Sequence, residues 1–354
     1  MSELIQRPSS GDLTFEQQRG HAMVEAGQVA NRFASDASFE DYKSRQSTNT
    51  LKTQKAALDC FALFLAESNL PGFSGAELQT SPLAWHGVTW GIVSGFVKWM
   101  LNKGYAVATI NNRLSTVRVY AELAGKAGEI PQQEIALIQT VKGYAGRHAR
   151  HIDEKREAKG IPTRNGRKKA SHTPLSNLDR ERLKTAHDDT PQGRRDRLLM
   201  CILLDHGLRA SEVSLLTVDS FDLEAGTLTF YRPKVGKTQT HRLSEDTTVA
   251  ASCYIGRDVE DGPVMIGSKK DSGLRSNTTM SANSLSRRVR QLATEILGND
   301  RVSSHDGRHK WATMAAQAGN DMLVIQEAGG WTGFGMVRRY VDDNAIANEG
   351  LKLG

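Results

Sequence analysis

From residue 51 to residue 141, apolar side chains recur every three or four positions in four successive runs. This spacing predicts four amphipathic helices, because residues three or four apart lie on one face of a helix. Pro71, Gly72 and Gly104 fall between the runs, where proline and glycine end helices. We therefore predict a compact all-helical domain over 46–146.

The pattern changes in the second half of the chain. Continuous apolar residues over 198–204 predict a buried helix, and alternation over 227–231, answered by 238–243 after a turn, predicts a β-hairpin. Helical spacing returns over 284–297. The fold class that we expect is mainly α (α+β), with a mostly helical second domain over 173–345 that carries a small antiparallel sheet.

Three segments lack apolar periodicity. Residues 1–45 are polar and rich in small side chains, which predicts a partly ordered N-terminal arm, and 346–354 form a short C-terminal tail. Residues 147–172 separate the two predicted domains and are strongly basic. Such a segment is either a solvated linker or a linker that crosses a phosphate backbone, and the domain on each side favours the second interpretation.

The composition is that of a globular protein, and the sequence indicates its cellular location. The 354 residues are 38% hydrophobic and 24% charged, and no run reaches the roughly 20 apolar residues of a membrane span. The N-terminus lacks the apolar core of a signal peptide. We expect a cytoplasmic protein without membrane contact. The net charge of +6 permits nucleic-acid binding but does not establish it.

The cysteines give no sign of a disulfide or a metal site. Cys60, Cys201 and Cys253 are odd in number and far apart in the chain, and no two have the spacing of a metal-ligand pair. Buried, reduced thiols in a cytosolic protein are the interpretation that we favour.

Candidate chemistry is concentrated in the last 150 residues. The polar residues with distinctive local sequences are Arg209 in His-Gly-Leu-Arg-Ala-Ser-Glu, His305 and Arg308 in His-Asp-Gly-Arg-His, Trp331 in Gly-Gly-Trp-Thr, and Tyr340 in Arg-Arg-Tyr-Val. Two arginines can neutralise a phosphate, since a guanidinium matches two phosphate oxygens at once. A tyrosine oxygen can then replace one ester bond with another. This set is what an enzyme needs to attack a phosphodiester.

The order and spacing of these residues resemble the tyrosine recombinases of the phage-integrase superfamily. The resemblance spans roughly residues 45 to 345, with specific motifs in 205–342. It implies that Tyr340 is the nucleophile and that Arg209 and Arg308 clamp the scissile phosphate. It assigns Glu212 to orienting Arg209.

The resemblance also implies supporting roles for three further residues. His305 would act as a hydrogen-bonding group or proton acceptor. Trp331 stands where many members carry a second histidine, and its indole N–H can support a phosphate oxygen but cannot shuttle a proton. A lysine on the hairpin turn should be the general acid, and we favour Lys234 over Lys237.

One pattern raises a metal as an alternative. His305 and His309 are four residues apart, which is the spacing of two zinc ligands on a helix. The sequence has no glutamate in the matching position and no evident third ligand. We therefore expect no metal and no other cofactor, and we expect His309 to support the fold.

As a member of this superfamily, the protein would be a site-specific DNA recombinase or integrase. The resemblance implies a 3′-phosphotyrosyl intermediate, a Holliday junction, and a homo-tetramer on two sites in double-stranded DNA. An accessory directionality or DNA-bending protein, and nucleoid association when DNA is bound, are further expectations. A type IB topoisomerase-like nicking-closing enzyme and a non-catalytic DNA-binding relative remain alternatives.

Candidate DNA contacts come from the polar faces of the predicted helices and from the basic linker. They are Arg113, Arg118, Arg287, Arg288, Lys168 and Lys169.

Overall fold

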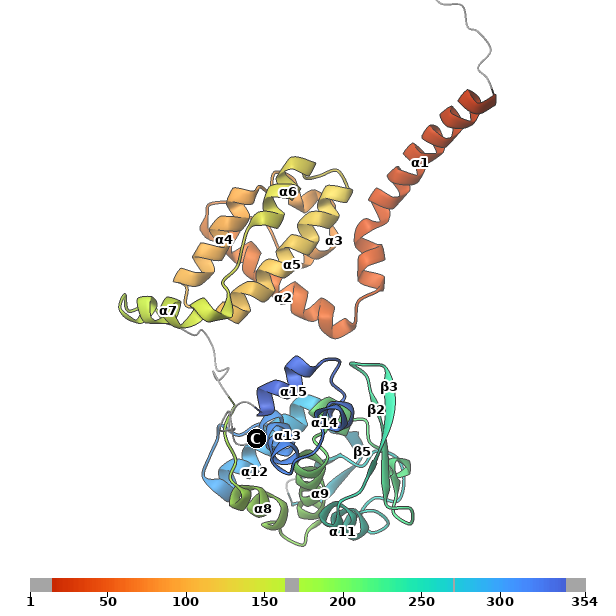
Figure 1. Cartoon of the computed structure of the whole chain (residues 1–354), viewed down its shortest axis with the longest axis vertical. Helices are drawn as coiled ribbons and strands as arrows, with labels where there is room; N and C mark the ends of the chain where they lie inside the picture. The colour runs from red at the N-terminus through yellow and green to blue at the C-terminus, as the bar shows by residue number, and fades with distance from the viewer. Residues whose placement is uncertain (1–14, 163–171, 270, 342–354) are drawn as a thin grey trace, which may run out of the picture. The chain divides into compact units, whose positions relative to one another are not determined.

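The computed structural model describes residues 15–162, 172–269 and 271–341. It divides into two compact units, Met1–Arg167 and Lys168–Gly354. Each unit has its own hydrophobic core, and its helices and strands are labelled in Figure 1.

The first unit is helical throughout its described part. Its elements are α1 (Phe15–Ser44), α2 (Thr48–Glu67), α3 (Gly75–Thr80), the 3-10 helix η1 (Pro82–Trp85), α4 (Trp90–Asn102), α5 (Val107–Lys126), α6 (Gln132–Thr140) and α7 (Gly146–Glu157). An aromatic cluster fills the core, where the Phe61 ring lies 5.0 Å from Phe96 and 5.8 Å from Trp85 between centroids. Aromatic pairs at such distances add to the free energy gained by burial.

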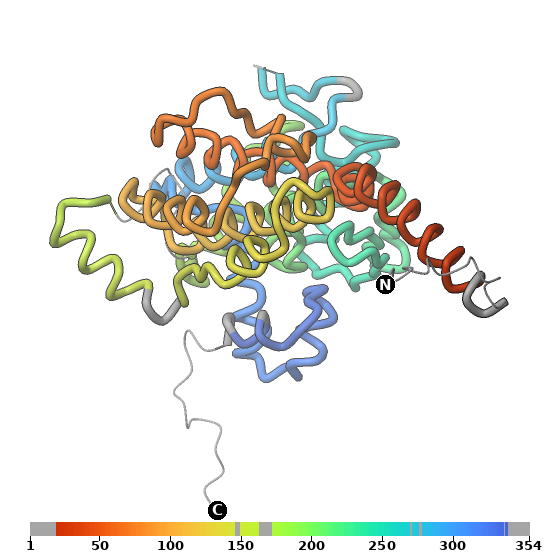
Figure 2. Tube along the Cα trace, turned by 90° about the horizontal axis from the view of Figure 1, so that it is seen from above, coloured from red at the N-terminus to blue at the C-terminus, as the bar shows by residue number. Residues whose placement is uncertain are grey.

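Helix α1 lies where the sequence predicted only a partly ordered arm. Its N-terminal part extends away from the other helices of its unit (Figures 1 and 2), and Met23 and Phe33 are largely exposed there. Its C-terminal part packs on the unit, since Phe39 is buried with its ring 5.7 Å from Tyr120. The predicted domain start at residue 46 therefore omits residues that belong to this core.

Part of the predicted linker is also folded. Helix α7 covers 146–157, and Arg156 is buried because its Nη2 donates to the carbonyls of Leu101 at 2.9 Å and Tyr105 at 3.0 Å. The linker residues 163–171 lie outside the described part.

In its described residues, the second unit is a mostly helical domain with two small antiparallel sheets. Its elements are α8 (Asn177–Thr185), α9 (Pro191–Asp205), α10 (Ala210–Val213), η2 (Val218–Ser220), β1 (Phe221–Asp222), β2 (Thr227–Arg232), β3 (Lys237–Arg242), α11 (Glu245–Tyr254), β4 (Ile266–Ser268), β5 (Leu274–Thr279), α12 (Ala282–Leu297), α13 (Ser304–Gln317), α14 (Met322–Gly329) and α15 (Phe334–Val341). The sheets have the orders β1-β2-β3 and β4-β5. The predicted hairpin is confirmed, and its register pairs Thr227 with Arg242 and Arg232 with Lys237.

Helix α9 is the centre of this unit and contacts α8, α11 and α13 (Figure 1). The Thr190 hydroxyl caps its first turn by accepting from the Gly193 amide, and Pro191 occupies the first helical position. All residues over 198–204 are buried, as expected for a helix that is apolar on every side. The predicted fold class, mainly helical with a small antiparallel sheet, is confirmed.

Candidate active site

Arg209 is positioned by the end of α9 and by a close approach of α13. The chain leaves α9 through Gly207, which has a φ of +61°, a conformation that favours glycine. A Cβ on Gly207 would lie 2.4 Å from the Trp311 ring of α13. Glycine is therefore required here both by backbone conformation and by space. The chain therefore runs directly against α13 at Gly207, two residues before Arg209.

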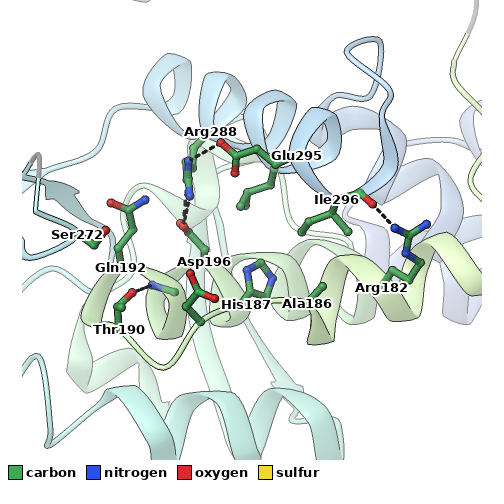
Figure 3. Close-up of a pocket in the computed structure, with 13 residues that line it drawn as sticks. Arg182, Ala186, His187, Thr190, Gln192, Asp196, Ser272, Arg288, Glu295 and Ile296 are labelled. Carbon is green, nitrogen blue, oxygen red and sulfur yellow. Dashed lines mark hydrogen bonds and ion pairs between the residues drawn. The ribbon is translucent and has the colours of Figure 1, made fainter.

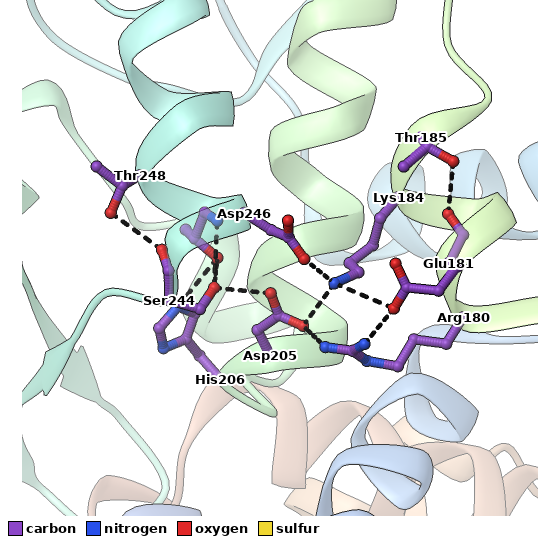
Figure 4. Close-up of polar contacts among 10 residues, drawn as sticks. Arg180, Glu181, Lys184, Thr185, Asp205, His206, Ser244, Asp246 and Thr248 are labelled. Atoms are coloured by element: carbon purple, nitrogen blue, oxygen red, sulfur yellow. Dashed lines mark hydrogen bonds and ion pairs between the residues drawn. The ribbon is translucent and has the colours of Figure 1, made fainter. Parts of the chain in front are cut away.

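A network of buried charges fixes the C-terminal end of α9 (Figure 4). Asp205, its last residue, pairs with Arg180, lies 3.4 Å from the Lys184 ammonium, and accepts a hydrogen bond of 2.7 Å from Ser244. Lys184 also pairs with Asp246. Burial alone would lower the pKa of Lys184, but the two aspartates together raise it above its ordinary value. The network joins α8, α9 and α11 just before the site.

Glu212 links two arginines. Its Oε1 accepts from Arg209 Nη1 at 2.7 Å, and its Oε2 accepts from the Arg209 amide and from Arg232 Nη1, both at 2.8 Å. Only 1% of the Glu212 side chain is exposed, against 23% for Arg209. The predicted orienting contact of Glu212 with Arg209 is thus present. Arg232, which is wholly buried, was not predicted.

Arg232 carries a signal that sequence reasoning missed. Residues 228, 230 and 232 are the buried positions of β2, and alternate residues of a strand face the same side. Extending the alternation by one residue places Arg232 on the inner face, beside Leu228 and Phe230. A cation on a buried strand face requires a partner, and this observation could have directed attention to Glu212.

Arg308 is 1% exposed and lies between the end of α9 and the end of α14. Its Nη1 donates to the Gly207 carbonyl at 2.5 Å, and its Nη2 donates to the Gly329 carbonyl. The guanidinium lies 4.3 Å from the centre of the Trp331 ring, in cation–π contact. Arg308, Trp331 and the loop that ends in Arg209 are therefore brought together.

The histidines are grouped on and beside α13. His305 lies in the first turn and is exposed, one helical turn before Arg308. The ring of His309 stacks on His172 at 3.9 Å between centroids and meets His305 edge-on at 6.3 Å. The stack on His172 gives His309 a packing role. Among the described residues, no group of three or more His, Cys, Asp or Glu side chains is arranged to hold a metal ion.

The two candidate lysines differ in their surroundings. Lys234 lies in the hairpin turn and is exposed, and no ion pair joins it to another residue within the described ranges. Lys237 opens β3 and its ammonium lies 3.3 Å from Glu327. Gln239 of the same strand donates to the Glu327 carbonyl at 2.7 Å, so the hairpin is attached to the last turn of α14.

Tyr340 belongs to α15, which packs against α13 and α14. Its backbone lies in this helix, and its side chain lies outside the described part. The helix is anchored three residues earlier by Val337, which is buried in a cluster with Ala312, Ile325 and Trp331.

Three of the six predicted DNA contacts are engaged within the protein. Arg113 lies 4.3 Å from the Tyr105 ring, and Arg118 donates to the Gln139 carbonyl at 2.7 Å. Arg288 pairs at 2.7 Å with the fully buried Asp196. These three half-buried guanidinium groups each contact their own unit, and their contact with DNA stays a prediction.

The other three predicted DNA contacts are Arg287, Lys168 and Lys169. Arg287 is exposed on α12. Lys168 and Lys169 lie outside the described residues.

A polar pocket of about 430 Å³ lies elsewhere, between α8, the start of α9 and α12 (Figure 3). Its two arginines already bond to neighbours: Arg288 to Asp196 and Glu295, and Arg182 to the Ile296 carbonyl. Of the residues predicted from sequence, only Arg288 lines this pocket. The candidate site is therefore the arginine cluster and not this pocket.

No helix in the described ranges has both the length and the apolar character needed to cross a membrane.

Comparison with known proteins identifies relatives of both sequence and fold. The sequence profile of the Phage integrase family matches residues 175–346. Tyrosine recombinase XerA of Pyrococcus furiosus is 25% identical over 233 residues, which cover 66% of this chain and 75% of the relative. Tyrosine recombinase XerC of Natranaerobius thermophilus is 24% identical over 269 residues, 73% of this chain and 80% of the relative.

Two solved structures share the fold. The Tn1549 transposon integrase in complex with transposon right end DNA has a TM-score of 0.59 at 15% identity, covering 88% of this chain and 96% of that one. A lambda integrase dimer bound to a COC′ core site has a TM-score of 0.57 at 15% identity, covering 90% and 98%.

Proposed function

We propose that this protein cuts and rejoins DNA through a 3′-phosphotyrosyl intermediate on Tyr340. The chain belongs to the tyrosine recombinase superfamily, whose members carry out site-specific DNA recombination. The observation that carries the proposal is the cluster of Arg209, Arg308 and Trp331. Arg308 contacts the Trp331 ring and donates to the carbonyls of Gly207, two residues before Arg209, and of Gly329, two residues before Trp331. Tyr340 is on the helix that packs against α13 and α14.

In the proposed reaction, the Tyr340 oxygen attacks the scissile phosphorus and its proton passes to a base, for which His305 is the candidate. The bond from phosphorus to the 5′ oxygen breaks, and Lys234 gives that oxygen a proton. Arg209 and Arg308 neutralise the charge that builds on the non-bridging oxygens. Such preorganised charge stabilisation is usually the largest contribution to catalysis.

Rejoining is the reverse reaction with a different hydroxyl. A 5′ hydroxyl of a partner duplex attacks the phosphotyrosine, restores a phosphodiester and releases the tyrosine. One ester replaces another at each step, so the energy of the bond is retained in the intermediate. The proposed cycle therefore needs neither ATP nor a metal ion.

The partner that we propose is double-stranded DNA, which the Tn1549 and lambda integrases bind in their solved structures. Strand exchange between two duplexes through a Holliday junction requires two DNA sites, and a homo-tetramer would supply one tyrosine for each exchanged end. An accessory DNA-bending or directionality protein, and a place in the cytoplasm on the nucleoid, belong to the same proposal.

A covalent-trapping assay tests the proposal. The full-length protein is incubated in EDTA with nicked duplexes drawn from its native flanking DNA, and the products are separated under denaturing conditions. We expect an adduct that resists denaturant and disappears with protease. The variant Tyr340→Phe should form none, whereas Tyr105→Phe, a half-buried tyrosine of the first unit, should form it as wild type does.

The products also separate the alternatives. An adduct followed by relaxation of one duplex, without exchange between two, would favour the topoisomerase-like reaction. Tight DNA binding with no adduct would favour the non-catalytic relative and contradict the proposal.

A further inference from the structure

Arg232, at the end of β2, is a cation with no exposed surface. Its Nη1 donates to Glu212 at 2.8 Å, its Nη2 donates to the Ala328 carbonyl at 2.6 Å, and its Nε donates to Gln239. The guanidinium also lies 4.7 Å from the Phe230 ring. Every face of the group is thus in contact with the protein.

Stability alone does not account for this charge. Burial removes a guanidinium from water at high cost, and replacing a buried ion pair by apolar groups of similar volume is often neutral or stabilising. Burial accordingly acts to lower the pKa of Arg232, and Glu212 opposes that shift. The three polar partners of Arg232 come from three elements, α10, β3 and the end of α14, which all border the candidate site.

We propose that Arg232 is a positioning residue, which holds the Glu212 carboxylate against Arg209 and so fixes the guanidinium that meets the scissile phosphate. The inference rests on the function proposed above. With Oε2 held by Arg232, Glu212 presents Oε1 to a single N–H group of Arg209. The remaining N–H groups of the Arg209 guanidinium have no other hydrogen bond within the described chain and are left for a phosphate.

Charge balance leads to the same conclusion. Glu212 alone would neutralise Arg209, leaving an ion pair of zero net charge beside the phosphate. Arg232 adds a second positive charge to the same carboxylate, so the group of three carries a net charge of +1. Loss of Arg232 would therefore lower the positive potential at the phosphate as well as loosen the geometry.

The contact with Ala328 places Arg232 next to Arg308, the second arginine of the site, at the end of α14. The carbonyls of Ala328 and Gly329 are consecutive, and they accept from Arg232 and Arg308, respectively. Two guanidinium groups thus cap the C-terminal end of α14, where the helix dipole favours positive charge. Gly330 makes room for this arrangement, since a Cβ there would lie 2.6 Å from Arg232 Cδ.

The test compares Arg232→Lys and Arg232→Met with wild type in single-turnover formation of the tyrosine adduct on nicked duplexes. One duplex has a normal scissile phosphate, and the other has a methylphosphonate, which lacks one negative charge. We expect Arg232→Met to be slower on the normal phosphate by about 10- to 100-fold, the range for loss of a group that orients a reactive one. Arg232→Lys, which keeps the charge, should recover part of the rate.

The methylphosphonate provides the readout that a purely structural role would not change. Because less charge needs to be neutralised, Arg232→Met should lose much less rate on this substrate, and DNA affinity should stay at the wild-type value. The matched control is Arg195→Lys, which alters another fully buried arginine, paired with Asp196 near the start of α9. It should change the rates on both substrates equally or not at all.

Equal slowing of Arg232→Met on both substrates would overturn the inference, as would a wild-type rate on the normal phosphate. If thermal melting finds Arg232→Met unfolded, the ratio of rates for Arg232→Lys decides in the same way. A wild-type protein that forms no adduct at all would instead overturn the proposed function, and the inference with it.

Discussion

Replacing Glu212 by glutamine should strongly destabilise the second unit while leaving the shape of the side chain almost unchanged. The carboxylate is 1% exposed and accepts three hydrogen bonds from Arg209 and Arg232. Glutamine keeps one acceptor oxygen and turns its NH₂ group toward a guanidinium donor. The wholly buried Arg232 thereby loses its counter-ion.

The magnitude follows from these contacts. A hydrogen bond between charged groups contributes roughly 1.5–3 kcal/mol, and a neutral one contributes about 1 kcal/mol. Three charged bonds would become at most two bonds to a neutral oxygen, which predicts a loss of about 2.5–7 kcal/mol in the free energy of unfolding. Removing one partner of a buried ion pair costs about the same amount.

Hydrogen exchange in urea, measured by mass spectrometry on the full-length chain, reports the two units separately. Peptides from α9 follow the core of the second unit, and peptides from α5 follow the first. Glu212→Gln should shift the α9 transition to lower urea and leave α5 unchanged. The exposed Glu224 provides the control, because Glu224→Gln should change the free energy by less than about 0.5 kcal/mol.

A double variant tests the cause of the loss. Adding Arg232→Met to Glu212→Gln should recover part of the stability, since the charge left unpaired by the first change is then removed. A loss below about 1 kcal/mol for Glu212→Gln would refute the reasoning, given the 3–5 kcal/mol expected for a buried pair. Equal shifts of α9 and α5 would refute its local origin.

Three further predictions concern other parts of the molecule. Burial lowers the pKa of His206 to about 4, so between pH 4 and the ordinary pKa near 6.5 the unfolded chain binds more protons than the folded one. The contribution of neutral His206 to stability should therefore be complete above about pH 6.5 and fall by roughly 3 kcal/mol toward pH 4. Urea titrations of His206→Gln should show a weaker dependence of stability on pH. Burial raises the pKa of the Cys201 thiol to about 12, so a disulfide reagent at pH 8 should modify the half-exposed Cys253 well before Cys201, and equal rates in the native protein would contradict this burial. Arg287→Ala should weaken DNA binding and lower its salt dependence, and an unchanged slope in a binding titration over salt concentration would remove Arg287 from the interface.

Local signals predicted most of the elements. The period of apolar residues identified helices α2, α4, α5 and α6 of the first unit, and alternation identified the β2–β3 hairpin, whose register came from the structure. Helix α1 was missed because its exposed part has no apolar stripe facing a core, and such a helix looks like a polar arm in sequence. The folding of α7 was missed because its anchor, Arg156, bonds to backbone carbonyls, which leave no trace in the sequence.

The sequence by itself determined which residues we propose for phosphodiester exchange, because distinctive local motifs surround Arg209, Arg308 and Trp331. Only the tertiary structure decided what each charge contacts. Arg288 and Arg232 are both strongly basic residues next to apolar ones, yet Arg288 pairs with Asp196 beside the polar pocket and Arg232 joins the site through Glu212. The physical reason is that an ion pair between distant residues depends on the packing of whole helices and strands, whereas a helical or strand pattern depends only on neighbours along the chain.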